Sequence, residues 1–239
     1  MVLYPDSSLL LLIPGIILSV WAQFKVKHTY AKYAEIATRS GLTGAEVAQL
    51  IMRNAEVRTA EGARTYALGI NCPIQAVPGE LTDHYDPRER VLRLSEGVYH
   101  GRSIAALGVA AHEVGHAIQH ANLYSFLMWR NAIYPMVSIS STLSWPLLFG
   151  GIIFGIGPLL KIGILLFSLA VLFTLITLPV EFDASKRAIR ALASGGYLTD
   201  DELYGAKKVL SAAALTYVAA AAMALLQLLR LILIARGRD

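Results

Sequence analysis

The sequence predicts a mainly α membrane protein with four transmembrane helices and a small α+β part, and three observations support this fold class. Hydrophobic residues occupy 55% of the 239 positions and charged residues only 16%, whereas soluble domains are about a quarter charged. The mean hydropathy is positive, at +0.52. The apolar residues also gather in long segments that approach the ~20 residues a helix needs to cross a bilayer.

Four segments are apolar and long enough to be predicted as membrane spans. They cover residues 8–24, 133–156, 162–180 and 209–234. The first has an apolar core about as long as that of a signal peptide. No small-residue cleavage site follows it, so we expect it to remain as a span. Pro135 and Pro146 are expected to kink the second span.

Lysine and arginine residues beside the spans predict the orientation, because positively charged loops stay in the cytoplasm. The segment before the first span has none, and the turn between the second and third spans has only Lys161. The other two connecting segments are basic near the membrane, at Lys25, Lys27, Lys32, Arg39, Lys186, Arg187, Arg190, Lys207 and Lys208. We therefore expect both of these segments in the cytoplasm and both termini outside, with Arg236 and Arg238 weighing mildly against an outside C-terminus.

The spans and loops together predict five parts along the chain. These are a first span over 1–24, a cytoplasmic part over 25–121 with a helix at 104–121, the second and third spans over 122–180, a cytoplasmic segment over 181–208, and the fourth span with its tail over 209–239. No repeat or low-complexity linker interrupts this order.

Local signals place secondary structure in the cytoplasmic segments. Thr43 with Glu46, and later Thr199 with Glu202, have the spacing of capping boxes, and Ser103 can cap the helix at 104–121. Residues 74–77 and the RVLRL stretch at 90–94 alternate like strands, separated by the turn-rich PGELTDHYDPRE. The pair Gly195-Gly196 is a C-cap signal, and the helix after it is expected to run directly into the fourth span.

The stretch GVAAHEVGHAIQH, residues 108–120, carries the clearest chemical signal. His112 and His116 are four apart, so they lie on one face of a helix about one turn from each other. This spacing allows two imidazoles to bind one zinc ion, and Glu113 is placed to activate a metal-bound water. Gly115 and the nearby alanines keep the helix thin, so that another backbone can approach closely.

His120 has the same spacing from His116, but helix geometry argues against it as a third ligand. Its Cα lies about 12 Å along the axis from that of His112 and is rotated by roughly 80°. An uninterrupted helix cannot bring all three side chains to one metal. Metal sites with a further histidine use a glycine turn to fold the chain back, and this sequence has none there.

Glu181, in LPVEFDASKRA at the cytoplasmic end of the third span, is the better candidate for the third ligand. A carboxylate at that depth is costly and points to function, and two histidines with one glutamate are a common catalytic zinc set. The alternative is an interfacial glutamate paired with Lys186 or Arg187. Asp183 is a candidate to hydrogen-bond a ligand histidine, or else an exposed loop residue.

Several stretches together resemble one known family. Residues 77–121, together with TGAEVA (43–48), VEFDASKRA (180–188) and KKVLSAAALTYVAAA (207–221), resemble the YugP-type putative neutral zinc metallopeptidases of bacterial membranes. The resemblance implies a multi-pass membrane protein with zinc at His112 and His116 and with Glu113 as the catalytic residue.

A more distant resemblance is to the membrane peptidases of the CAAX prenyl endopeptidase and heat-shock protease group. Those proteins carry HExxH and a later E-x-x-A-D whose glutamate is the third zinc ligand. Here Glu181 to Ala184 fits that pattern, but Ser185 stands where aspartate is expected.

These observations predict a membrane-bound zinc endopeptidase whose active site faces the cytoplasm in a zincin-like α+β part. One zinc ion per chain, held by His112, His116 and Glu181, would activate a water whose proton Glu113 accepts. The RVLRL strand is a candidate edge for an extended peptide or protein substrate, membrane proteins included.

Two alternatives stay open. An intramembrane zinc protease would need HExxH within the bilayer, but only eight uninterrupted apolar residues, Ile104 to Ala111, precede His112. An inactive, peptidase-like membrane scaffold is the other alternative, and the retention of Glu113 and Glu181 weighs against it. The single Cys72 excludes an intrachain disulfide, and the net charge of +4 without a basic tract argues against a nucleic-acid partner. The sequence does not indicate the oligomeric state.

Overall fold

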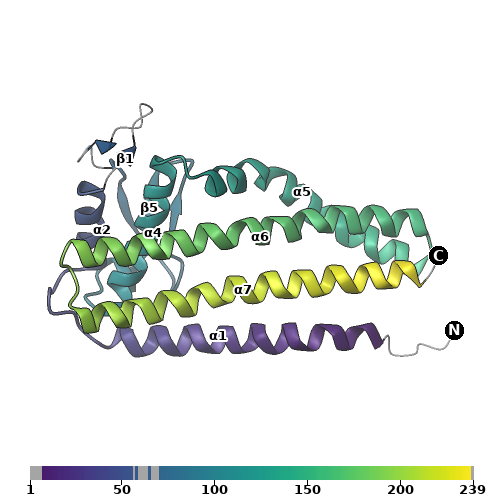
Figure 1. Ribbon diagram of the computed structural model, residues 1–239, viewed down its shortest axis with the longest axis horizontal. Coiled ribbons are helices and arrows are strands. Elements are labelled where there is room, and N and C mark those ends of the chain that lie inside the picture. Colours follow the sequence, from purple (N-terminus) through teal and green to yellow (C-terminus); the bar gives the residue numbers. More distant parts are fainter. Residues whose placement is uncertain (1–6, 56, 59–63, 66–69, 238–239) are drawn as a thin grey trace. The chain divides into compact units, whose positions relative to one another are not determined.

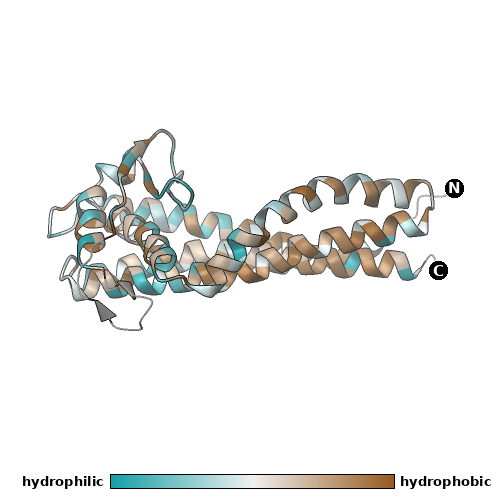
Figure 2. Ribbon diagram, turned by 90° about the horizontal axis from the view of Figure 1, so that it is seen from above, coloured by the Kyte–Doolittle hydropathy of each residue, from teal (hydrophilic) through white to brown (hydrophobic). Residues whose placement is uncertain are grey.

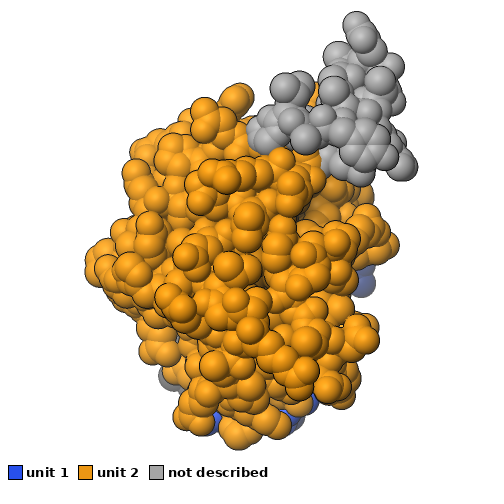
Figure 3. Space-filling model, turned by 90° about the vertical axis from the view of Figure 1, so that its left-hand side faces the viewer, with its two compact units in different colours: residues 1–24, 129–179, 215–239 blue, residues 25–128, 180–214 orange. Residues whose placement is uncertain are grey.

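The computed structural model describes residues 7–55, 57–58, 64–65 and 70–237, and residue contacts divide the chain into two compact units (Figure 3). Unit 1 comprises Met1–Phe24, Trp129–Pro179 and Leu215–Asp239. Unit 2 comprises Lys25–Met128 and Val180–Ala214. The predicted parts 1–24, 25–121 and 209–239 each include some residues outside the described ranges.

Four helical segments are long and apolar enough to cross a membrane, as predicted. The first is the 3₁₀ turn η1 (Ser7–Leu12) continued by α1 (Ile13–Ala34), and the others are α5 (Ser125–Ile153), α6 (Gly157–Ser194) and α7 (Asp200–Arg236), all drawn in Figure 1. Three of these helices extend beyond both ends of their predicted spans, because apolar composition marks only the span and not the polar turns that continue the helix; α5 begins before its predicted span of 133–156 and ends at Ile153. The assigned helix of α5 runs through Pro135 and Pro146.

Unit 1 has the character of a membrane-embedded bundle. Its buried cluster joins Leu148, Leu160, Phe167, Val171 and Leu231 from three helices. Other large apolar side chains point outward, including Phe154, which is 75% exposed, and Leu165, which is 66% exposed. Figure 2 shows the corresponding brown, hydrophobic residues along these helices. Apolar side chains that face outward are stable in lipid and unfavourable in water, so the chain is a mainly α membrane protein.

Unit 2 contains the shorter helices α2 (Gly44–Arg53), α3 (Glu96–Tyr99) and α4 (Ile104–Ala121). The capping box of Thr43 and Glu46 forms as predicted, with both reciprocal hydrogen bonds present. The Ser103 hydroxyl accepts from the Ala106 amide and caps α4, whose bounds match the predicted 104–121.

The junction between α6 and α7 also follows the predicted signals. Gly196 adopts a positive φ of 63° just after α6 ends. The Glu202 carboxylate accepts from the Thr199 amide where α7 begins. The single helix α7 then continues into the fourth apolar segment, as expected.

The strands of unit 2 form two small sheets. β1 (Val57–Arg58) pairs antiparallel with β2 (Arg64–Thr65). The second sheet has the order β3-β5-β4, where β3 is Ile74–Val77, β4 is His84–Asp86 and β5 is Val91–Ser95. β5 pairs in parallel with β3 and antiparallel with β4.

This strand order corrects the prediction that RVLRL, residues 90–94, forms a sheet edge. β5 carries most of that stretch and lies in the middle of its sheet, with both of its sides paired. The second side of β5 is paired with β4, which lies within the PGELTDHYDPRE segment that was predicted to be only turn. A strand of three residues has too short an alternation to be distinguished from a turn in the sequence.

The buried centre of unit 2 is formed by α4 with α2, β5 and the last turns of α6. Leu92, Leu94 and Leu107 are fully buried there, together with Val98 and Val114. A Cβ on Gly115 would lie 2.6 Å from the carbonyl oxygen of Ala184, so only glycine allows α6 to pass this close to α4. This close approach, which the sequence predicted for the Gly115 side of the helix, brings α6 side chains beside the histidines of α4.

A candidate metal centre between two helices of unit 2

Three predicted ligand residues meet at the crossing of α4 and α6. The Nε2 atom of His112 lies 3.3 Å from Glu181 Oε2, and the Nε2 atom of His116 lies 3.5 Å from the same oxygen. The candidate ligand atoms of His112, His116 and Glu181 all lie within 4.8 Å of one another. Glu181 is only 4% exposed and His116 is 8% exposed, so this convergence lies in the interior.

The separations between these atoms fit a tetrahedral zinc ion. Bonds of about 2.0–2.1 Å to nitrogen and oxygen place two tetrahedral ligands about 3.3–3.4 Å apart. The two measured histidine–glutamate separations, 3.3 and 3.5 Å, are close to that value. Two imidazoles with one carboxylate are also a common protein ligand set of catalytic zinc. The residues present therefore fit a zinc ion.

The ring nitrogens on the opposite side of each histidine have partners that the sequence did not predict. The Ser185 hydroxyl lies 3.1 Å from His112 Nδ1. The Gln119 carbonyl oxygen lies 3.0 Å from His116 Nδ1. Such partners fix the ring orientation and leave Nε2 available as a metal ligand. The sequence contained a signal for each partner. Gln119 is three residues after His116 on the same helix. Ser185 occupies the position of the aspartate in the E-x-x-A-D pattern.

Gln119 also connects the histidine to Asp183. The fully buried Gln119 amide donates to the Val180 carbonyl at 2.8 Å and to the Asp183 carboxylate at 2.9 Å. Asp183 in turn accepts from Arg187. Asp183 was predicted either to hydrogen-bond a ligand histidine or to be an exposed loop residue. In the structure it is a half-buried residue of α6, and it is connected to His116 through Gln119.

Glu113 lies on α4 between the two histidines and faces a different neighbour. Its side chain is buried, and Oε2 accepts a hydrogen bond of 3.0 Å from the backbone amide of Tyr85 in β4. This hydrogen bond fixes one oxygen of the carboxylate. Glu113 is not a member of the three-residue cluster of potential metal ligands, which leaves its carboxylate available for proton transfer.

His120 is paired with Tyr85. The Tyr85 hydroxyl lies 2.8 Å from His120 Nδ1, and the two rings meet edge to face. Burial raises the pKa of Tyr85 to about 12, and burial lowers the pKa of His120. At neutral pH the phenol is therefore protonated and donates to an uncharged imidazole.

The electrostatics of the cluster favour a cation between the helices. Burial by itself lowers the pKa of His116, but the hydrogen bond to Glu181 and the charge of Glu113 outweigh burial and raise this pKa above its ordinary value. In the absence of metal the carboxylates thus favour a proton on His116. A bound divalent ion would replace that proton and supply the positive charge instead.

Comparison with known proteins identifies related sequences over almost the whole chain. The family model described as "Putative neutral zinc metallopeptidase" matches residues 8–236. A protein of Bacillus subtilis (strain 168) named "Putative membrane protease YugP" is 51% identical over 228 residues, which cover 93% of this chain and 94% of that protein. No solved structure matches the chain.

Proposed function

Given that the chain belongs to the family of putative neutral zinc metallopeptidases, we propose that it is a multi-pass membrane zinc endopeptidase. In this proposal His112, His116 and Glu181 hold one zinc ion per chain, and Glu113 is the general base. The observation that carries the proposal is the meeting of three ligand atoms, from the half-buried His112 and the buried His116 and Glu181, with both histidine–glutamate separations close to those of tetrahedral zinc.

The proposed chemistry divides the work between α4 and α6. When bound, zinc lowers the pKa of a coordinated water from about 15.7 toward about 7 in the strongest cases. Glu113 would accept a proton from the water as its oxygen adds to the peptide carbonyl, and would deliver that proton to the amine nitrogen as the C–N bond breaks. The Tyr85 amide, which donates to Glu113, holds the carboxylate in one orientation during both transfers.

An extended substrate must add to an outer strand, because both sides of β5 are already paired. Of the two outer strands, β4 is the one whose backbone contacts Glu113, through the Tyr85 amide. We therefore assign the peptide or protein substrate to the β4 side of the site, where main-chain hydrogen bonds supply affinity independent of side chains.

The side of the membrane follows from the basic residues. Lys25 and Lys27 follow the first predicted span, 8–24, and Lys186 and Arg187 follow the third, 162–180. Both groups belong to unit 2, which contains all three proposed ligands. We therefore propose that the active site faces the cytoplasm. A reporter fused after Asp239 is expected outside the cytoplasm, and a cytoplasmic reporter would contradict this orientation or the number of spans.

The proposed function is tested by metal analysis of detergent-purified protein together with cleavage of casein. We expect about one zinc ion per chain and cleavage that stops when a chelator removes the metal and resumes when zinc is restored. Protein that binds zinc but cleaves neither casein nor a panel of membrane proteins would instead favour the non-catalytic scaffold.

A further inference from the structure

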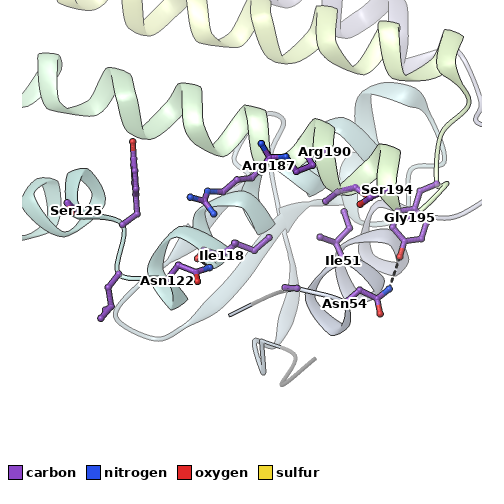
Figure 4. A pocket seen from close by; sticks show the side chains of 14 residues that line it. Ile51, Asn54, Ile118, Asn122, Ser125, Arg187, Arg190, Ser194 and Gly195 are labelled. Carbon is purple, nitrogen blue, oxygen red and sulfur yellow. Dashed lines mark hydrogen bonds between the residues drawn. The ribbon is translucent and has the colours of Figure 1, made fainter. Parts of the chain in front are cut away.

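Unit 2 contains a pocket of about 890 Å³ that is separate from the three proposed metal ligands. We call it the arginine pocket, and Figure 4 shows the side chains around it. Its 14 lining residues are Ile51, Asn54, Ala55, Ile118, Asn122, Leu123, Tyr124, Ser125, Arg187, Arg190, Ala191, Ser194, Gly195 and Tyr197. The volume lies within the ~300–1,000 Å³ typical of ligand sites.

The arginine pocket is positively charged. Arg187 and Arg190 are three residues apart on α6, so they share a helix face, and both line the pocket. None of the described residues that line it is an aspartate or a glutamate. Asp183 already pairs with Arg187 through Nε, whereas Arg190 has no ion pair among the described residues, so a ligand carboxylate would supply its counter-charge.

Both polar and apolar side chains line the pocket together with the two arginines. The Asn54 amide donates to the Tyr197 hydroxyl at 3.1 Å, and the Arg187 guanidinium lies over the Tyr124 ring. Ile51, Ile118 and Leu123 contribute apolar surface beside them. A ligand that suits this lining combines a carboxylate with a short aliphatic stem, as glutamate and aspartate side chains do.

A chain of hydrogen bonds links the pocket to the proposed metal centre. Arg187 donates to Asp183, which accepts from Gln119, whose carbonyl oxygen contacts His116. Three side-chain contacts therefore separate a pocket residue from a proposed zinc ligand. The arginine pocket and the proposed metal centre are therefore built on the same two helices, α4 and α6.

We propose that the arginine pocket binds acidic side chains of the peptide substrate, with Arg190 and the terminal nitrogens of Arg187 as the carboxylate-binding groups. This inference rests on the proposed function, since it names the class of peptide that the same protein accepts. A peptide is favoured over a phospholipid headgroup because all lining residues belong to unit 2 and lie outside the predicted membrane spans 133–156 and 162–180.

The test measures binding instead of cleavage, so that it remains readable if the protein proves inactive. A short rhodamine-labelled peptide with several glutamates, and the same peptide with glutamines in their place, are titrated into the Glu113→Gln protein in neutral detergent. We expect the glutamate peptide to bind at least about tenfold more tightly, as charge-assisted hydrogen bonds to arginine exceed neutral ones.

Arg190→Gln should abolish this preference, and Lys186→Gln is its matched control. Both changes remove one positive charge from exposed positions of α6, but only Arg190 lines the pocket. Arg190→Glu is a second variant, expected to favour the glutamine peptide. Circular dichroism verifies that each variant is folded.

Three results would overturn the proposal. The first is equal affinity of the two peptides for the Glu113→Gln protein that carries no pocket substitution. The second is a glutamate preference that survives in Arg190→Gln or disappears equally in Lys186→Gln. The third is displacement of the glutamate peptide by phosphatidylglycerol added to the detergent, which would assign the pocket to a lipid headgroup. Cleavage of casein together with any of these three results would leave the proposed function standing and remove only the proposal for the pocket.

Discussion

The two sides of α4 use the same residue type for different purposes. On the side facing α6, His112 and His116 direct Nε2 toward the buried Glu181, and Ser185 and Gln119 hold the opposite ring nitrogens. On the side facing β4, His120 forms a neutral hydrogen bond with Tyr85. Successive histidines among these three are four residues apart along the same helix. The partner that packs opposite each histidine, and not the spacing alone, therefore determines which of them can bind a metal.

Glu113→Gln tests the assignment on the β4 side and carries the largest expected effect. The amide cannot accept the proton of a bound water, so casein cleavage should fall by about 10²- to 10⁴-fold. Zinc content should stay at the parent level, because the three proposed ligands are unchanged. Glu96→Gln, at an exposed position of α3, is the control and should retain full activity. Loss of metal from Glu113→Gln, or full activity, would remove Glu113 from its role.

Gly115→Ala tests the close approach on the α6 side. The added methyl would lie 2.6 Å from a backbone oxygen of Ala184, so the helices must separate. We expect the free energy of unfolding to fall by about 1–3 kcal/mol, together with a measurable loss of zinc affinity as Glu181 moves away. Gly97→Ala is the matched control, because no atom lies within 4 Å of a Cβ there. Equal stability and zinc affinity in the two variants would show that the approach of α6 is unimportant.

Gln119→Leu and Ser185→Ala test the partners behind the two ligand histidines. Each substitution leaves a ring nitrogen without its hydrogen bond, which typically costs about 10- to 100-fold in metal affinity or activity. Competition with a zinc-binding dye measures this change.

Ser185→Asp provides the contrasting result for the same position. A carboxylate can also accept from His112 Nδ1–H, so zinc affinity should stay near or above the parent value. A loss in Ser185→Asp as large as that in Ser185→Ala would mean that Ser185 acts through packing and not through this hydrogen bond.

His120→Ala carries the smallest expected effect on the metal. Its imidazole bonds to Tyr85 and is absent from the three-residue cluster. Zinc content should therefore remain near the parent level, measured by elemental analysis beside His116→Ala, which should lose zinc. A loss in His120→Ala equal to that in His116→Ala would abolish the distinction between the two sides of α4.

The sequence is sufficient to predict the features of this site that depend on local signals. The capping box at Thr43, the cap at Ser103 and the bounds of α4 all appear as predicted. The four apolar helices and the family also agree with the prediction. These features depend on residues within a few positions of one another, or on apolar runs long enough to recognise directly.

The features that the sequence did not predict depend on pairing between distant segments. β4 has only three residues and exists because β5 pairs with it, which also places β5 in the middle of the sheet. The side-chain amide of Gln119 donates to Val180 and Asp183, which are over sixty residues away. No local pattern specifies such contacts, so the environment of the site becomes visible only when α4 and α6 are seen together.

A structure of the zinc-loaded protein tests the central claim most directly. The account predicts one zinc ion between α4 and α6, with Nε2 of His112, Nε2 of His116 and a carboxylate oxygen of Glu181 each about 2.0–2.2 Å from it. Zinc at that distance from His120 or Asp183, with Glu181 turned toward Lys186, would contradict the ligand set and the assignment of the two sides of α4.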